Sequence, residues 1–285
     1  MIGSMAIVSL NGRAPLLEAH ESPVLGRDCR LDLRGLKWAT PFDVAALATL
    51  VRRANMRGYA PIVEPPTDAA VRRYLVDLGA ADHIPGTWGE EAGSAVDRPL
   101  LRLTHLDESH EWDDLVNNQW PAVATRLKNP KLASRLFEIL GELIDNATTH
   151  GNSEVGTFVC VQRYTGDTSG LSPGLWVGIA DAGMGIPRHL RRREEYADFG
   201  TDEELIGLAR KPWVTGTRDR RGWGLTEVFE QLGQAGVSNV VMRSGRGEAR
   251  YWFRSGRMSG ARYRGLRRSV PGTWVHAEIQ EAIDA

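Results

Sequence analysis

The chain has 285 residues, of which 42% are hydrophobic and 25% charged, a composition typical of a globular protein with one large or two modest domains. Its formal net charge of -1 excludes a bulk electrostatic attraction to nucleic acid or to an anionic membrane, so any such contact has to be local. The 2 cysteines are too few for a disulfide framework or a structural zinc site, which fits a reducing compartment.

No apolar run approaches the roughly 20 residues that span a bilayer. The opening "MIGSMAIVSL" has neither the basic start nor the long apolar stretch of a signal peptide. We therefore expect a cytoplasmic protein without membrane contact.

Residues 1–90 predict a first domain with the order β-α-β-α. "CRLDLRGL" alternates like a strand, "PFDVAALATLVRRANMRG" has helical spacing, "APIVEPP" is a short strand, and "TDAAVRRYLVDLGA" is a helix with Thr67 as the expected N-cap. In residues 84–99, "IPGTWGEEAGSAVDRP", Gly, Pro, Ser and acidic residues replace apolar periodicity, which predicts a linker.

Residues 100–285 predict a second domain of the α+β class. Helical patterns near 110–127 and 131–150 come before strands at "TFVCVQRY", "GLWVGIAD", "NVVMRSG", "ARYWFRSG" and "TWVHAEI", with one more helix at "LTEVFEQLGQAG". Helices with a mixed, largely antiparallel sheet form a layered α+β sandwich, so we expect an α/β protein of two domains.

The helical stretch "ELIDNATTHG" places Glu142 and Asn146 four residues apart on one face, opposite an apolar face. A polar helix face commonly does no more than meet water. Two glycine motifs argue for a site. Asp181 ends an apolar strand and is followed by Gly183 and Gly185, and a carboxylate buried there needs a donor partner.

The second motif, "RRGWGLTEVFEQLG", puts Gly222 and Gly224 just before a helix, where free backbone N–H groups receive phosphate. The chain contains no Walker A sequence, which excludes a P-loop protein. Taken in this order, the three segments resemble the GHKL, or Bergerat-fold, ATPase family over roughly residues 100–281. His150 and Gly151 after the asparagine are similar to the branch of anti-sigma-factor kinases.

The resemblance implies an ATP site with Mg²⁺. Asn146 would hold the metal through its side-chain oxygen, Glu142 would be the general base, and Asp181 would accept the exocyclic amine of adenine. The nucleotide-binding residues it implies are Asn146, His150, Asp181, Gly183, Met184, Gly185, Ile186, Thr217, Gly222, Trp223, Gly224 and Leu225. His150 is equally suited to cap the end of its helix.

Residues 188–220 would be the ATP lid, with a helical stretch at 201–210 that begins at a capping Thr201. Thr217, Arg218 and Arg220 are its candidates for contact with phosphate. The alternative is a solvated surface loop.

A basic segment lies between Tyr251 and Arg268, with aromatic side chains among the arginines. Its arginines are Arg254, Arg257, Arg262, Arg264, Arg267 and Arg268. They could pair with nucleic acid, or the segment could be a hairpin with its aromatics inward and its arginines in water. The acidic "HLDESHEWDD" (105–114) fits a helix start better than a metal site.

"LDLRGLKWATPFDVAALATLVRRA" (31–54) resembles a STAS domain of the anti-sigma-antagonist type, a module that binds a partner protein. Pro41 and Phe42 occupy the positions where that family carries its phosphate-accepting serine, and only Thr40 has a hydroxyl nearby. This departure predicts that the phosphorylation switch is lost.

The sequence therefore predicts an ATP-binding regulatory protein of the GHKL type, in which Mg-ATP binding, with or without slow hydrolysis, controls a partner protein. Two alternatives stay open: a protein serine/threonine kinase of the anti-sigma type, and a nucleotide-gated clamp that works with nucleic-acid machinery.

Overall fold

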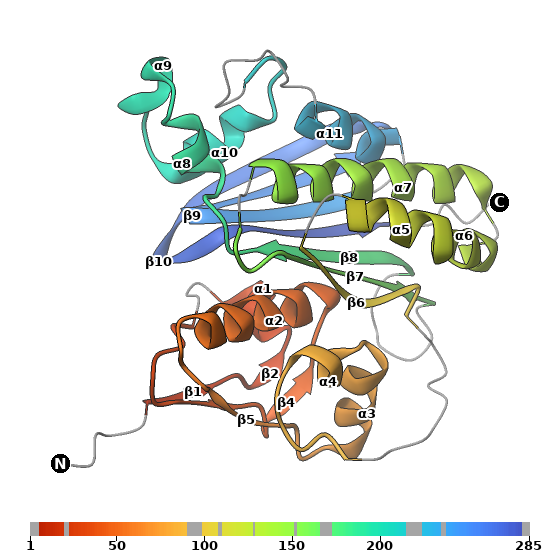
Figure 1. Cartoon of the computed structure of the whole chain (residues 1–285). Helices are drawn as coiled ribbons and strands as arrows, with labels where there is room; N and C mark the ends of the chain where they lie inside the picture. The colour runs from red at the N-terminus through yellow and green to blue at the C-terminus, as the bar shows by residue number, and fades with distance from the viewer. Residues whose placement is uncertain are drawn as a thin grey trace.

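The computed structural model describes residues 6–19, 23–89, 99–107, 110–127, 129–150, 153–165, 173–214, 224–234 and 238–280. It has a mixed α/β fold whose elements form stacked layers (Figure 1). From top to bottom in that view, these layers are helices, a five-stranded sheet, a second set of helices and a small parallel sheet. None of the helices described is both long and apolar enough to cross a membrane.

The N-terminal region, residues 6–89, contains the small parallel sheet in the order β1-β3-β5, while β2 pairs with β4. Its strands are β1 Ala6–Ser9, β2 Gly12–Arg13, β3 Cys29–Asp32, β4 Leu36–Trp38 and β5 Ile62–Glu64. Its helices are α1 Pro15–Glu18, α2 Pro41–Met56, α3 Ala69–Asp77 and α4 Ala80–His83. The predicted strand, helix, strand and helix correspond to β3, α2, β5 and α3, whereas β1, β2, β4, α1 and α4 were not predicted.

The C-terminal region, residues 99–280, contains the five-stranded antiparallel sheet in the order β6-β7-β8-β10-β9. Its strands are β6 Leu101–Leu106, β7 Thr157–Tyr164, β8 Gly174–Asp181, β9 Ser238–Arg254 and β10 Arg257–Ile279. Its helices are α5 His110–Asn118, α6 Trp120–Leu127, α7 Pro130–Asp145, the π-helix η1 Asn146–His150, α8 Ile186–Leu190, α9 Glu194–Ala197, α10 Asp202–Ala209 and α11 Gly224–Gln234. Strand β6 was not predicted, and β9 is one long strand where two were expected.

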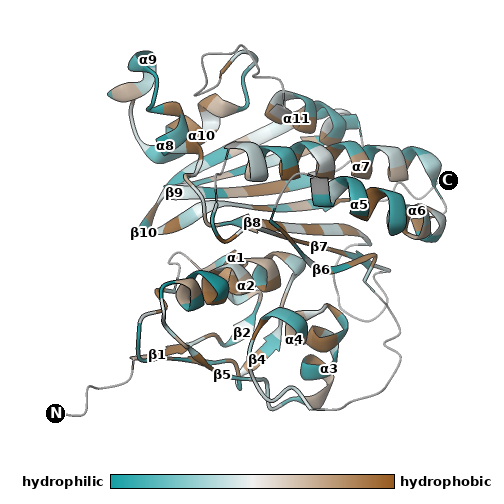
Figure 2. Cartoon of the chain, viewed as in Figure 1, coloured by the Kyte–Doolittle hydropathy of each residue, from teal (hydrophilic) through white to brown (hydrophobic). Residues whose placement is uncertain are grey.

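Helices cover both faces of the five-stranded sheet. On one face, α7 buries the stripe that contains Leu136, Leu140 and Leu143 and leaves its polar stripe outward (Figure 2). On the other face lies α2 from the N-terminal region, which contacts β7, β8 and β10. Because both faces are covered, every residue of β8 is buried, which explains its continuous apolar sequence.

The contact between α2 and β8 is unusually close at Gly178. A Cβ atom there would collide with the backbone of Pro41 and Phe42 at the start of α2. About two turns later on the helix, Thr49 Oγ1 donates a hydrogen bond to Ala180 O at 3.1 Å. The two regions therefore share one hydrophobic core, in which Phe42 packs edge-on against Trp274 of β10.

A buried ion pair fastens α1 to the same sheet. Arg243 of β9, 2% exposed, pairs with Glu248 at 2.7 Å and donates to the carbonyl oxygens of Leu16 and Leu17. Burial alone would raise the pKa of Glu248, but hydrogen bonds from arginines hold it at about 2. In the interior, the guanidinium group of Arg243 thus has Glu248 to balance its charge and two carbonyl oxygens to accept its N–H hydrogen bonds.

Of the N-caps of α2 and α3, one was not predicted from the sequence and the other was predicted at the wrong residue. Thr40 is the N-cap of α2 in a capping box with Asp43, as its Oγ1 accepts from Asp43 N at 3.1 Å. The expected N-cap of α3, Thr67, is wrong. Asp68 caps α3 by accepting from two backbone N–H groups, while the Thr67 hydroxyl donates to Arg34 O. Of the expected linker, residues 90–98 lie outside the described chain.

Candidate functional site

Asp181 ends β8 with a side chain that is 1% exposed. Its Oδ1 accepts from Gly183 N at 2.7 Å and its Oδ2 from Thr273 N at 3.0 Å. Burial raises the pKa of this carboxyl group to about 7, although the two N–H groups lower it. Its partners among the described residues are backbone N–H groups and no basic side chain, so Asp181 is a buried acceptor with a pKa close to neutral pH, as functional carboxylates commonly have.

Asp181 belongs to a row of polar side chains that crosses four strands, here called the polar row. Its members, from β7, β8, β10 and β9, are Thr157, Asp181, Thr273 and Ser244. Side chains opposite one another in antiparallel strands share a face. The next row on that face is apolar and buried, namely Val159, Ile179, Val275 and Met242. The polar row therefore stands at the end of an otherwise apolar sheet face, which makes it the candidate site.

The turn after Asp181 is tied to this row. Gly185 has φ +77°, a backbone angle that residues with a side chain rarely adopt. A Cβ atom at this position would lie 2.6 Å from Ser244 Oγ. Ser244 Oγ accepts from Ile186 N at 2.8 Å and donates to Gly272 O at 2.7 Å. The predicted glycine turn is thus held in one conformation beside Asp181, and Met184 lies half-buried within it.

The helix that carries Glu142 and Asn146 changes from α-helical to π-helical geometry near its end. At Asn146 the α-helix α7 continues as the π-helix η1, a rare geometry that is frequent at functional sites. Asn146 Nδ2 donates to Glu142 O at 2.6 Å, which leaves its Oδ1 as the atom that a cation would use. Burial, with Glu227 and Asp145 nearby, raises the pKa of Glu142.

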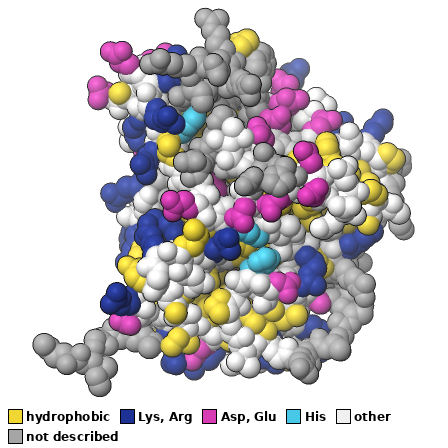
Figure 3. All heavy atoms as spheres, viewed as in Figure 1, with side chains coloured by type: hydrophobic (Ala, Val, Ile, Leu, Met, Phe, Trp, Pro, Cys, Tyr) yellow, Lys and Arg dark blue, Asp and Glu magenta, His cyan; other side chains and the backbone are white. Residues whose placement is uncertain are grey.

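Acidic side chains gather near the middle of the face drawn in Figure 3. The carboxylates of Glu227 and Asp145 repel the charged form of Glu142, so this part of the surface concentrates negative charge. Among the described residues no group of three or more His, Cys, Asp or Glu side chains could hold a metal by itself. Asn146 is then the one protein ligand predicted for Mg²⁺, which takes most of its ligands from phosphate and water.

Several residues of the expected nucleotide site and its motifs lie outside the described part of the chain. Thr217, Arg218, Arg220, Gly222, Trp223 and Gly151 lie outside the described residues. Only the backbone of His150 and Gly224 is described, at the end of η1 and the start of α11. Leu225 follows as a half-buried residue that packs against the core between α7 and the five-stranded sheet.

The expected lid is in part a packed layer. Thr201 is the N-cap of helix α10, as predicted, and the helix buries Leu205 and Ile206. It lies against β9 so closely that a Cβ at Gly247 would be 2.5 Å from Glu203 N. Residues 202–209 therefore do not form a loose flap in this structure.

The basic segment forms the end of the β9–β10 hairpin, and its side chains follow the inward-aromatic alternative. Tyr251 and Phe253 are buried against Phe229 of α11. Trp252 is 40% exposed on the opposite face. Arg254, Arg257 and Arg262 are exposed and have no acidic partner among the described residues, whereas Arg264 pairs with Glu248. Tyr263 is also 40% exposed, on the face opposite to Trp252, so the hairpin offers two exposed rings on different faces where nucleic-acid stacking would call for a row of them on one face.

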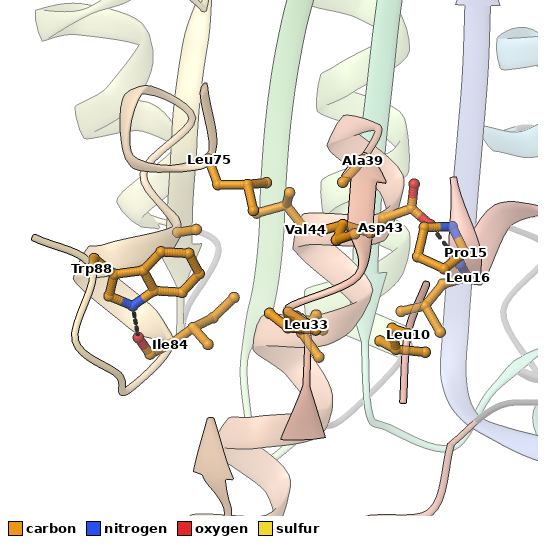
Figure 4. A pocket seen from close by; sticks show the side chains of 13 residues that line it. Leu10, Pro15, Leu16, Leu33, Ala39, Asp43, Val44, Leu75, Ile84 and Trp88 are labelled. Atoms are coloured by element: carbon orange, nitrogen blue, oxygen red, sulfur yellow. Dashed lines mark hydrogen bonds between the residues drawn. The ribbon is translucent and has the colours of Figure 1, made fainter. Parts of the chain in front are cut away.

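A small internal space in the N-terminal region is not a second site (Figure 4). Apolar side chains line most of it, among them Leu33, Val44 and Leu75. Its one carboxylate, Asp43, already accepts from Thr40 and from the backbone N–H groups of α1. The space therefore presents no polar group to a ligand.

No family model and no curated protein matches this chain.

Sequence reasoning missed Thr157, Thr273 and Ser244, which join Asp181 only through strand register. The one signal available was the threonine in the closing strand "SVPGTWVHAEI".

Proposed function

We propose that the C-terminal region binds Mg-ATP at the polar row and that its nucleotide state controls a partner protein, in the manner of a GHKL ATPase. The observation that carries this proposal is Asp181, a buried carboxylate without a basic partner among the described residues. A buried acceptor of this kind calls for a donor, and the exocyclic amine of adenine is one.

The other residues have roles that follow from their chemistry. Asn146 Oδ1 binds the Mg²⁺ ion, which brings the phosphates close to an acidic surface that would otherwise repel them. Glu142 lies one helical turn earlier, and its raised pKa suits a general base that activates water or a hydroxyl group. Gly183 and Gly185 let the backbone pass close to the base.

The N-terminal region serves, in this proposal, as a STAS-like interaction domain that has lost its phosphate acceptor. Thr40 is fully buried and its hydroxyl donates to Asp43 Oδ2 at 2.7 Å, so a kinase cannot reach it without unfolding the start of α2. The interaction with the ATP-binding region takes place within one chain and leaves the outer surface for the partner protein.

Calorimetric titration of the full chain with ATP, with and without Mg²⁺, tests the proposal. We expect Mg²⁺-dependent binding that Asp181→Ala and Asn146→Ala abolish while the circular dichroism spectrum stays unchanged. Binding that survives both substitutions would place the nucleotide elsewhere. Transfer of radiolabelled phosphate to a separate protein would identify a kinase rather than a switch.

A further inference from the structure

Strand β1 has one edge that no other described strand pairs with. It stands at the end of the sheet order β1-β3-β5 and pairs with β3 alone. Ala6 N and Leu10 N donate to backbone oxygens at the two ends of β3, so the even-numbered residues direct their backbone groups toward β3. Because this direction alternates along a strand, Ile7 and Ser9 direct their N–H and C=O groups outward. The outer edge of β1 can therefore accept a further strand.

The opposite edge of this sheet, on β5, is protected. Prolines flank the strand at Pro61, Pro65 and Pro66, and a proline has no N–H group to donate to an added strand. The chain at Gly86 also covers this edge, since a Cβ atom there would lie 3.2 Å from Val63 O. The four residues of β1, in contrast, include no proline and no charge, which are two features that commonly keep an edge from pairing. The sheet can therefore extend at β1 and not at β5.

An open groove of about 540 Å³ runs along the outer edge of β1. Residues of β1 line it, together with Glu18 of α1 and Arg268 of β10. Ile7, which also lines the groove, is 63% exposed, the largest fraction among the exposed large apolar side chains described. Val24, which follows Pro23 of the lining, is 62% exposed. Exposed apolar side chains beside an open strand edge favour a partner that covers both.

A second copy of the chain fits this edge in its backbone and in its charges. In an antiparallel pair of two β1 strands, Ile7 and Ser9 of one copy exchange hydrogen bonds with Ser9 and Ile7 of the other. The groove contains both signs of charge, Arg13 and Arg268 with Glu18. A two-fold axis brings the same surface of both copies together, so this surface supplies both partners of an ion pair. Because the pairing occupies the open edge of each copy and β5 is protected, the assembly stops at two.

We propose that two copies of this chain associate through β1, in an antiparallel pair that joins their 3-stranded sheets into one continuous sheet. Ile7 of each copy lies opposite Ser9 of the other, and the two copies of Val8 face one another at the two-fold axis. This inference goes beyond the proposed ATP-binding function and does not depend on it.

The test is the molar mass of the full chain in solution, measured by sedimentation velocity. A concentration series up to about 100 μM populates a dimer that has a micromolar Kd, and wild type is expected to be a dimer at its upper end. Ser9→Pro removes an outward donor and leaves the hydrogen bonds to β3 in place. Ile7→Lys puts like charges on neighbouring strands of the dimer. Both variants are expected to be monomers with the circular dichroism spectrum of wild type.

The matched control is Ile62→Lys, which adds the same charge at another exposed isoleucine, on the protected strand β5, and should leave the dimer intact. A wild type that stays monomeric across the series would overturn the inference. A dimer that persists in Ile7→Lys or in a folded Ser9→Pro variant would overturn it as well. If Ser9→Pro does not fold, Ile7→Lys decides alone, because its side chain lies in solvent in the single chain.

Discussion

The ionisation of Asp181 should make nucleotide binding depend on pH. Its pKa is raised by burial to about 7, and only the charged form is a full acceptor for an amine. Between pH 8 and pH 6 the charged share falls from about nine-tenths to about one-tenth, so ATP affinity should fall about tenfold. The affinity is measured by calorimetry across this range.

The control is Asp181→Asn, in which the phosphates and Mg²⁺ titrate as before but the carboxyl group is gone. The additional tenfold fall should be absent from this variant. Parallel pH profiles for the two proteins would show that Asp181 does not control binding. In the free protein the effect on folding stability runs in the opposite direction with pH. The raised pKa favours the folded state below the unfolded value of 3.8, and this stability is lost as the pH rises through about 7.

Glu142 is expected to act in catalysis and not in nucleotide binding. Glu142→Ala should bind Mg-ATP but lose hydrolysis or phosphate transfer by about a hundredfold or more, because general-base catalysis contributes on that order. The rate is followed by phosphate release and by radiolabel transfer. Glu138→Ala, one turn earlier on α7, is the matched control and should keep the wild-type rate. Wild-type turnover in Glu142→Ala would remove Glu142 from the catalytic role.

At the scale of one element, the start of α2 determines whether the N-terminal region can accept phosphate. The Thr40 hydroxyl is buried and bonded within the capping box. After incubation with Mg-ATP, intact-mass spectrometry should therefore show no added phosphate on residues 1–90. Stoichiometric phosphorylation at Thr40 would contradict this account and restore a kinase and substrate pair within one chain.

The elements that sequence predicted well are those with strong local signals. Strands β7 and β8 were predicted with their observed bounds, since turn residues limit each apolar run. The cap of α10 at Thr201 follows from its capping box. The cap of α3 could not be predicted in this way, because Thr67 and Asp68 are both good N-cap residues and only the path of the backbone decides between them.

The candidate site was only partly predictable for a related reason. Glu142, Asn146 and Asp181 stand in local patterns that carry chemistry. Thr157 and Ser244 have no such pattern, because strand pairing brings them to Asp181 from distant parts of the chain. Register of this kind cannot be read from one sequence until the strand order is known.

At the scale of the whole molecule, the N-terminal region is a layer of the fold and not a tethered module. A side chain at Gly178 would push α2 away from β8. Gly178→Ala should therefore destabilise the protein by about 1 to 3 kcal/mol. Because the two regions share one core, calorimetry should record one unfolding transition, at a lower temperature in the variant.

The matched control for this prediction is Gly26→Ala, where a Cβ would meet open space and the melting temperature should not fall. Two independent transitions in wild type, one for each region, would contradict a shared core.

The central claim, that buried Asp181 recognises an adenine base, is tested most directly by comparing ATP and GTP binding to the full chain by calorimetry in Mg²⁺. Guanine presents a carbonyl oxygen where Asp181 requires a donor, and an unpaired buried carboxylate costs about 1 to 3 kcal/mol. We expect wild type to bind ATP about 5- to 150-fold more tightly than GTP. Equal affinity for the two nucleotides would contradict the account.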